Sequence, residues 1–227
     1  DVVGIAFSHT PGRAFYVAAE ERLGQSAFEL FPVELDMKAH LEQLAPLFAD
    51  PSVKKGGQNV KYDVSVLQRH GIQVNGIGFD TMLESYVLDP AATSHGLDAL
   101  SLRYLGYKKI ATRDVIGSGA KQRNMRDTHD DEIFPYASED ADMTCRLHHL
   151  FRSKLAQDPA REALYRDVEL PLLPILLAME TRGVAIDTQV LKATGVEFKS
   201  RLKVLEEEAY QLAGEPFNLG SPKQVGE

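Results

Sequence analysis

The chain has 227 residues, 44% of them hydrophobic and 26% charged, which is enough apolar material for a buried core in one or two domains. Its net charge of −8 argues against an autonomous nucleic-acid-binding domain, since such domains are usually basic. The single cysteine, Cys145, excludes an intrachain disulfide, and the lack of a signal peptide or a membrane-length apolar run predicts a cytoplasmic protein with no membrane partner.

The first predicted elements are strands. Val2–Phe7 and Ala14–Ala18 are short runs rich in β-forming residues. The turn residues Thr10-Pro11-Gly12 lie between them, so the pattern predicts a β-hairpin. A helix that ends before Pro51 is expected next, because four apolar residues recur at helical spacing: Leu41, Leu44, Leu47 and Phe48.

Three further helices are predicted in the middle of the chain. One runs from Asp63 to His70 and stops at Gly71, after a strand or turn at Gln58–Asp63. A second spans Asp80–Leu88, where the first residue is a favourable helix cap. A third covers the apolar positions from Leu97 to Leu105 and is closed by a glycine.

The character of the chain changes after residue 116. Gly117–Asp131 is polar and carries several basic residues, which predicts an exposed loop, and a helix follows from about Asp131 to Leu155. Beyond Asp158-Pro159 the pattern is helical throughout. We therefore predict an α/β or α+β domain at residues 1–158 and a helical segment at 159–227.

The helical segment ends in a long amphipathic helix. Leucine and phenylalanine recur there every seven residues, a spacing suited to pairing with another helix, and Gly214 ends the pattern. The repeating positions are Leu191, Phe198, Leu205 and Leu212.

Asp140 is the residue that is hardest to explain as structure alone. It lies one helical turn after Tyr136, within an inward-facing apolar stripe. A buried carboxylate is costly unless something pairs with it, and a metal ion is the best candidate, with a neighbouring arginine or a boundary position as alternatives. The stripe consists of Phe134, Ala137, Ala141, Met143, Leu147, Leu150 and Phe151.

Asp63, Asp140 and Tyr136 form a candidate hydrolytic site. Phosphodiester hydrolysis needs charge neutralisation and an activated water, and two divalent ions about 4 Å apart can supply both. A tyrosine hydroxyl beside them can orient or deprotonate that water. Structural explanations stay open, with Asp63 as a helix N-cap and Tyr136 as a half-buried aromatic. Glu139 and Asp142 are expected to be solvated charges on the helix surface, and His148-His149 has no partner at a ligand spacing.

Several segments, taken together and in order, resemble the 3′–5′ proofreading exonuclease domain of bacterial family A DNA polymerases of the DNA polymerase I (Klenow) type. The resemblance covers essentially the whole chain and continues into the helices that enter the polymerase domain. The exonuclease-like segments are Gly57–Asp63, Phe79–Leu88 and Tyr136–Asp142, and the polymerase-like segments are Val168–Pro174, Arg182–Asp187 and Phe217–Gln224.

The resemblance implies a ribonuclease H-like α/β fold, a mixed sheet flanked by helices, here lacking its first strand and followed by a helical segment at the base of the polymerase thumb. It implies removal of the 3′-terminal nucleotide from single-stranded or frayed DNA with two Mg²⁺ or Mn²⁺ ions. Asp140 would bind one ion directly, Asp63 would hold the second largely through water, and Tyr136 would contact the attacking water. The single strand would lie along Gln58, Asn59, Lys61 and Tyr62, and the partner in the parent chain would be its polymerase domain.

The chain departs from the family at its start, because the first motif, Asp-x-Glu on the first strand, is missing. We therefore expect that this polypeptide cannot assemble the full two-ion site by itself. Many relatives also carry arginine where Ser94 stands here. Two alternatives remain open, namely a catalytically dead scaffold of the same fold and an RNA-trimming nuclease of the ribonuclease D kind.

Overall fold

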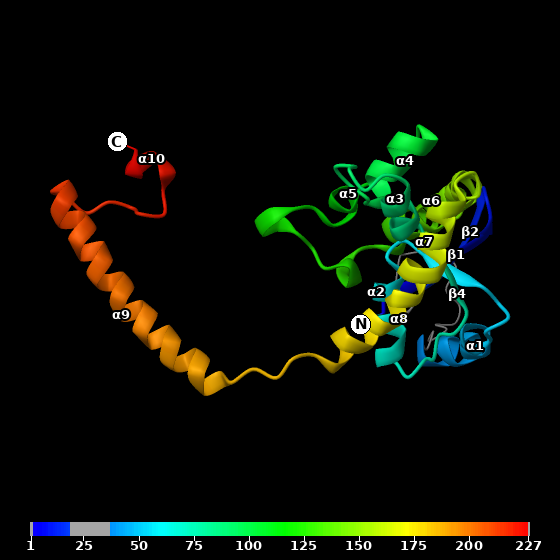
Figure 1. Cartoon of the computed structure of the whole chain (residues 1–227), viewed down its shortest axis with the longest axis horizontal. Helices are drawn as coiled ribbons and strands as arrows, with labels where there is room; N and C mark the ends of the chain where they lie inside the picture. The colour runs from blue at the N-terminus through cyan, green and yellow to red at the C-terminus, as the bar shows by residue number, and fades with distance from the viewer. Residues whose placement is uncertain (1, 19–36, 227) are drawn as a thin grey trace, which may run out of the picture. The chain divides into compact units, whose positions relative to one another are not determined.

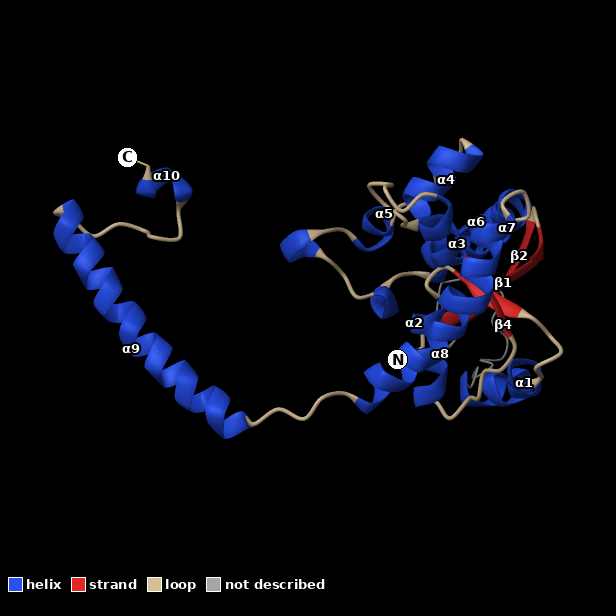
Figure 2. Ribbon diagram, in the orientation of Figure 1, coloured by secondary structure: helices blue, strands red, loops and turns tan. Residues whose placement is uncertain are grey.

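The structure, a computed structural model, describes residues 2–18 and 37–226 (Figure 1). Helices dominate the described part, and four short strands contribute two small sheets (Figure 2). This mixed α/β composition confirms the fold class predicted from the sequence. The elements before the long central helix are β1 (Gly4–Thr10), β2 (Arg13–Ala18), α1 (Met37–Ala49), β3 (Lys55–Gly57), α2 (Val60–Arg69), β4 (Ile77–Asp80), α3 (Thr81–Leu88), α4 (Leu97–Leu105), α5 (Thr112–Ile116), and the 3₁₀ turns η1 (Gly119–Lys121) and η2 (Met125–Asp127).

The predicted hairpin is present as the antiparallel pair β1–β2. Its turn includes Gly12, whose φ of 86° lies in the left-handed region that favours glycine. Strands β3 and β4 pair in parallel, with Gly56 opposite Phe79. A side chain at Gly56 would overlap the Phe79 ring, so glycine is required for this close approach. The parallel pair places the ends of β3 and β4, and thus Gly57 and Asp80, side by side.

The central helix α6 (Asp130–Leu155) organises the first part of the chain, because both hairpin strands and helices α3, α4 and α5 pack against it. Leu147 and Phe151 on α6 form a fully buried cluster with Leu100 of α4. The inward stripe predicted for this helix is confirmed there. Phe134 at its beginning is an exception, since it is 51% exposed and meets Tyr16 of β2 edge-to-face. The residue before it, Ile133, is 3% exposed, so Ile133 and not Phe134 faces the core at the start of α6.

Helix α2 begins earlier than predicted, at Val60 instead of Asp63. Its N-cap is Asn59, a non-glycine residue with φ of 59°. Asp63 consequently lies inside the first turn of the helix, and the interpretation of Asp63 as an N-cap is wrong. The apolar pair Val60 and Val64 explains the earlier start, because burying both on one face requires the helix to include Val60.

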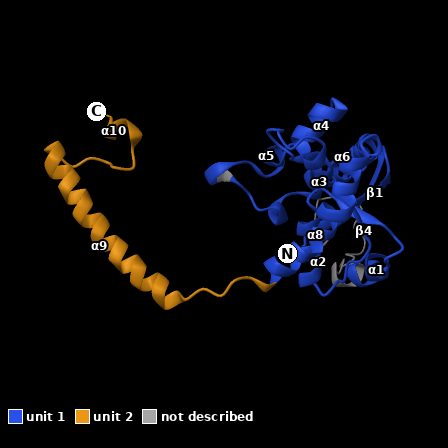
Figure 3. Cartoon of the chain, in the orientation of Figure 1, with its two compact units in different colours: residues 1–181 blue, residues 182–227 orange. Residues whose placement is uncertain are grey.

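The first compact unit comprises residues 1–181 and the second residues 182–227 (Figure 3). Three elements after the predicted boundary at residue 158 belong largely to the first unit, namely α7 (Pro159–Leu164), the π-helical segment η3 (Tyr165–Glu169) and α8 (Leu170–Arg182). Their attachment has a physical cause, since Tyr165 packs with Val87 of α3, and Leu173 and Leu177 pack with Val60 and Val64 of α2. The functional boundary at residue 158 stays a prediction.

The second unit contains α9 (Thr188–Ala213) and α10 (Pro222–Val225). The predicted amphipathic helix is confirmed as α9, with Asp187 capping its start and Gly214, at φ of 83°, following its end. Its repeated apolar residues Leu191, Phe198, Leu205 and Leu212 are all exposed. Among residues 2–18 and 37–226, no helix combines the length and the apolar character that crossing a membrane requires.

Candidate active site

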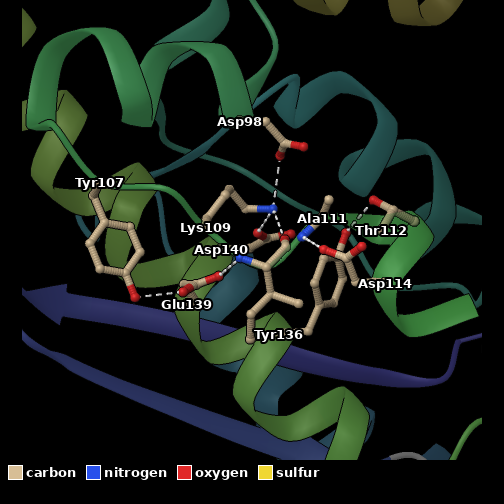
Figure 4. Close-up of polar contacts among 10 residues, drawn as sticks. Asp98, Tyr107, Lys109, Ala111, Thr112, Asp114, Tyr136, Glu139 and Asp140 are labelled. Atoms are coloured by element: carbon tan, nitrogen blue, oxygen red, sulfur yellow. Dashed lines mark hydrogen bonds and ion pairs between the residues drawn. The ribbon is translucent and has the colours of Figure 1, made fainter.

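Asp140 pairs with a lysine that the sequence reasoning missed. Lys109, in the loop between α4 and α5, points at α6 and places its Nζ 2.8 Å from Asp140 Oδ1 (Figure 4). The lysine side chain is only 2% exposed. Burial raises the pKa of Asp140, and the Lys109 ammonium opposes that increase by hydrogen bonding and charge. The carboxylate on α6, whose side chain is 30% exposed, thus has a lysine as its partner, where the sequence suggested a metal or an arginine.

The Lys109 ammonium has further partners besides Asp140. It donates to Asp98 Oδ1 over 2.9 Å and to the backbone oxygen of Ile110 over 2.7 Å. It also lies 4.9 Å from the centre of the Tyr136 ring, within the range of a cation–π contact. Burial lowers the pKa of Lys109, but hydrogen bonds and charge from Asp140 and Asp98 outweigh it, and the net shift is upward. Lys109 therefore remains an ammonium group.

Tyr136 lies beside Asp140 on α6, as the spacing of one helical turn predicts. Its hydroxyl and that of Thr112 are 2.9 Å apart, a hydrogen bond in which either group can donate (Figure 4). Burial and the charge of Asp140 raise the pKa of Tyr136. The phenol is therefore protonated at neutral pH and can offer a hydrogen bond to a neighbouring group.

Glu139 fixes the loop that carries Lys109. It accepts from the Tyr107 hydroxyl over 2.7 Å (Figure 4). It also accepts from the Ile110 amide over 2.6 Å. Asp142 similarly accepts from the Gly12 amide in the hairpin turn and pairs with Arg146. The expectation that Glu139 and Asp142 are merely solvated charges is wrong, because both carboxylates attach other segments to α6.

Asp63 occupies a different environment from Asp140. Although the residue is exposed, its carboxyl group faces the end of β3, where a Cβ atom on Gly57 would lie 3.5 Å from Asp63 Oδ2. Desolvation, together with the charge of nearby Asp80, raises the pKa of Asp63 to about 6. Desolvation of the carboxyl group contributes more to this increase than the charge of Asp80 does.

Asp80 joins the ends of the two parallel strands to the helices that follow them. Its carboxylate, 2% exposed, accepts from the amides of Met82 and Leu83 in α3 and from those of Asn59 and Val60 at the start of α2. The predicted cap of α3 is confirmed. The sequence did not indicate the additional link to α2, which holds Asp63 near β3.

The residues predicted to line a single strand fall into two groups. Tyr62 is 67% exposed, and Asn59 also faces solvent. Gln58 is used within the fold, since its amide donates to the His95 carbonyl and accepts from the Thr81 hydroxyl. Lys61 pairs with Glu180 on α8. In this structure Tyr62 and Asn59 are the more accessible of these four.

Asp140 and Asp63 each present an oxygen that suits a divalent ion. Oδ1 of Asp140 is shielded from water and already faces the Lys109 ammonium at 2.8 Å, so this oxygen suits a cation. The carboxyl group of Asp63, which is desolvated and close to the charge of Asp80, likewise suits a cation. Yet within the described ranges no three His, Cys, Asp or Glu side chains are grouped closely enough to hold a metal ion. Each aspartate fits as one ligand, and neither forms a complete site.

Comparison with known proteins identifies the family of this chain. Residues 12–156 match the family model described as 3′–5′ exonuclease. The chain therefore belongs to the 3′–5′ exonuclease family associated with A-type DNA polymerases.

Two relatives are DNA polymerase I from Pseudomonas aeruginosa, 42% identical over 99% of this chain, and DNA polymerase I from Rhizobium leguminosarum, 42% identical over 86% of it. The chain spans only 24% and 19% of the lengths of these relatives. A solved structure, the POL domain of Pol1 from M. smegmatis in complex with DNA primer-template and dNTP, covers 94% of this chain with a TM-score of 0.62 at 27% identity, and 31% of that chain is matched.

Proposed function

We propose that this chain is the exonuclease portion of a bacterial DNA polymerase I and removes the 3′-terminal nucleotide from single-stranded or frayed DNA. The match of residues 12–156 to the exonuclease family carries the proposal. The two relatives that are 42% identical support it, as does the structural neighbour that binds primer-template DNA. Residues beyond 158 would then form the entry to the polymerase domain of the same parent chain.

Asp140 and Asp63 would each hold a divalent ion, Mg²⁺ or Mn²⁺, in the complete parent site. When bound, such ions supply charge neutralisation and an activated water. Tyr136 would orient that water, and its raised pKa supports hydrogen-bond donation over proton abstraction. Asp80 acts through the backbone, because it fixes the start of α2 and thus the position of Asp63. Tyr62 and Asn59 would contact the terminal nucleotides, with Tyr62 offering an exposed ring for stacking.

The experiment is release of the terminal nucleotide from 5′-labelled single-stranded DNA in Mg²⁺ or Mn²⁺. The 227 residues alone are expected to be inactive, and the chain joined to an Asp-x-Glu strand from the resembled family is expected to be active. In that joined protein, Asp140→Ala should abolish most of the activity, since metal ligands act as a unit. The matched control is Glu132→Gln, an exposed carboxylate on the same helix.

Each of the other outcomes would support a different function or mechanism for this chain. An Asp140→Ala rate equal to that of the unsubstituted protein would remove Asp140 from the mechanism. Inactivity of a folded joined protein would support the scaffold alternative. Faster trimming of RNA than of DNA would support a ribonuclease D-like activity.

A further inference from the structure

Lys109 places its ammonium group against the shielded carboxylate oxygen of Asp140. Its Nζ is 2.8 Å from Asp140 Oδ1, an oxygen that is shielded from water. An ammonium group and a divalent cation cannot share one carboxylate oxygen without strong repulsion, particularly where water is largely excluded. Binding of a metal at this oxygen therefore requires the ammonium to move away.

The ammonium can move without losing all its partners. The Lys109 ammonium also donates to Asp98 Oδ1 at 2.9 Å and to the Ile110 carbonyl at 2.7 Å. Neither of these residues lies on α6, the helix that carries Asp140. Their hydrogen bonds persist if the lysine releases Asp140. Asp98 is also 60% exposed at its side chain, which leaves room for a small shift of the pair.

The backbone around Lys109 is held independently of Lys109 itself. Glu139 accepts from the Tyr107 hydroxyl and from the Ile110 amide, on both sides of Lys109 in sequence. Removal of the ammonium group should therefore leave the loop attached to α6. A substitution at Lys109 can therefore remove its charge without displacing the loop backbone.

We propose that Lys109 is the resident cation of the Asp140 site and competes with a divalent ion for this carboxylate. It neutralises Asp140 when no metal is bound and keeps Asp98 and the Ile110 carbonyl when a metal takes its place. Lys109 is a positioning residue, since it acts through Asp140. The inference rests on the proposed function in one respect, that Asp140 binds a divalent ion.

The test measures Mn²⁺ affinity of the 227-residue chain from the rise in its melting temperature with metal concentration. Lys109→Met removes the charge but keeps an apolar side chain of similar length. Without metal, this variant should melt at a lower temperature, because Asp98 and Asp140 lose their cation. Its Kd for Mn²⁺ should be lower than that of the wild type by roughly tenfold or more, since no ammonium has to be displaced.

Two controls isolate the charge at Asp140. Lys108→Met changes the adjacent, exposed lysine and should leave the Mn²⁺ affinity at its wild-type value. Lys109→Arg keeps the positive charge and should also show no gain. Adding Asp140→Asn to Lys109→Met should abolish the gain, because the carboxylate that receives the metal is then absent. If Lys109→Met does not fold, Lys109→Gln carries the same test, as it keeps hydrogen-bond donors without charge.

The proposed competition is overturned if folded Lys109→Met, or Lys109→Gln in its place, binds Mn²⁺ with an unchanged or higher Kd. The absence of any Mn²⁺ effect in that variant would overturn it as well. Failure of the metal role of Asp140 looks different. In that case Mn²⁺ would stabilise the wild type and its Asp140→Asn variant equally.

Discussion

The carboxylate of Asp80 accepts a hydrogen bond over 2.8 Å from the amide of Val60, so the end of strand β4 holds the first turn of helix α2. The two residues are 20 positions apart in the chain. The same carboxylate caps α3 through the amides of Met82 and Leu83. One side chain therefore aligns two helix starts at the edge where the parallel strands end, and it determines where the Asp63 carboxyl group can lie.

Replacing Asp80 should be costly. Asp80→Ala leaves several buried amides of α2 and α3 without their acceptor, and we expect the free energy of unfolding to fall by about 2–4 kcal/mol. Urea denaturation followed by circular dichroism measures the change. Asp187→Ala, which removes the exposed cap of α9, is the matched control and should cost about 1 kcal/mol. Equal losses for the two variants would show that the link to α2 contributes nothing.

Glu139→Gln should loosen the loop that carries Lys109. Glutamine keeps one acceptor oxygen and carries an NH2 donor in place of the other, so one of the two hydrogen bonds is lost and the other becomes neutral. The free energy of unfolding should fall by about 1–2 kcal/mol. Hydrogen exchange of the Ile110 amide should speed up. Exchange of the buried amides of α4 should change only as much as the lower free energy of unfolding requires. Glu132→Gln on the same helix serves as control. An unchanged exchange rate of the Ile110 amide in Glu139→Gln would contradict the conclusion that Glu139 holds this loop on α6.

Glu84 should make stability fall as the pH rises. The residue is 1% exposed, and burial raises its pKa above the usual value of 4.5, although the hydrogen bond with His148 opposes this. Above pH 4.5 the folded state then holds a proton that the unfolded state has lost. The free energy of unfolding must decline from there until the pH exceeds the pKa of the folded state.

Glu84→Gln should remove this decline while keeping an acceptor for His148. Urea unfolding of both proteins between roughly pH 4 and 8 gives the difference curve, in which titration of other groups largely cancels. The variant should gain stability relative to the wild type as the pH increases. Parallel curves would show that burial does not shift the pKa of Glu84.

Thr112→Val should affect the chemistry of Tyr136 more than the fold. The hydrogen bond from Thr112 lowers the pKa of the phenol, so its loss should raise that pKa further. We expect a change of less than about 1 kcal/mol in the free energy of unfolding, because Thr112 is exposed. NMR titration of the Tyr136 ring, assigned with Tyr136→Phe, gives the pKa. Thr188→Val at the start of α9 is the control, and a lower Tyr136 pKa in the Thr112 variant would refute the role of this bond.

Local patterns predicted the elements that depend on neighbouring residues. The β1–β2 hairpin, the cap of α3 by Asp80 and the end of α9 at Gly214 agree with the structure, because turn and cap preferences act within a few residues. The start of α2 was misplaced because the burial of Val60 against α8 outweighs the local preference for a cap at Asp63.

The sequence by itself determined the exonuclease family, the helical position of Asp140 beside Tyr136, and the expectation that Asp140 needs a partner, because these follow from motif order, helix periodicity and the cost of burying charge. Only the tertiary structure decided which group that partner is. Lys109 reaches Asp140 through a loop whose path depends on Glu139, and no sequence spacing encodes that contact. Charge pairing between distant segments is set by the packing of the elements that carry them, and it becomes visible only once those elements are placed.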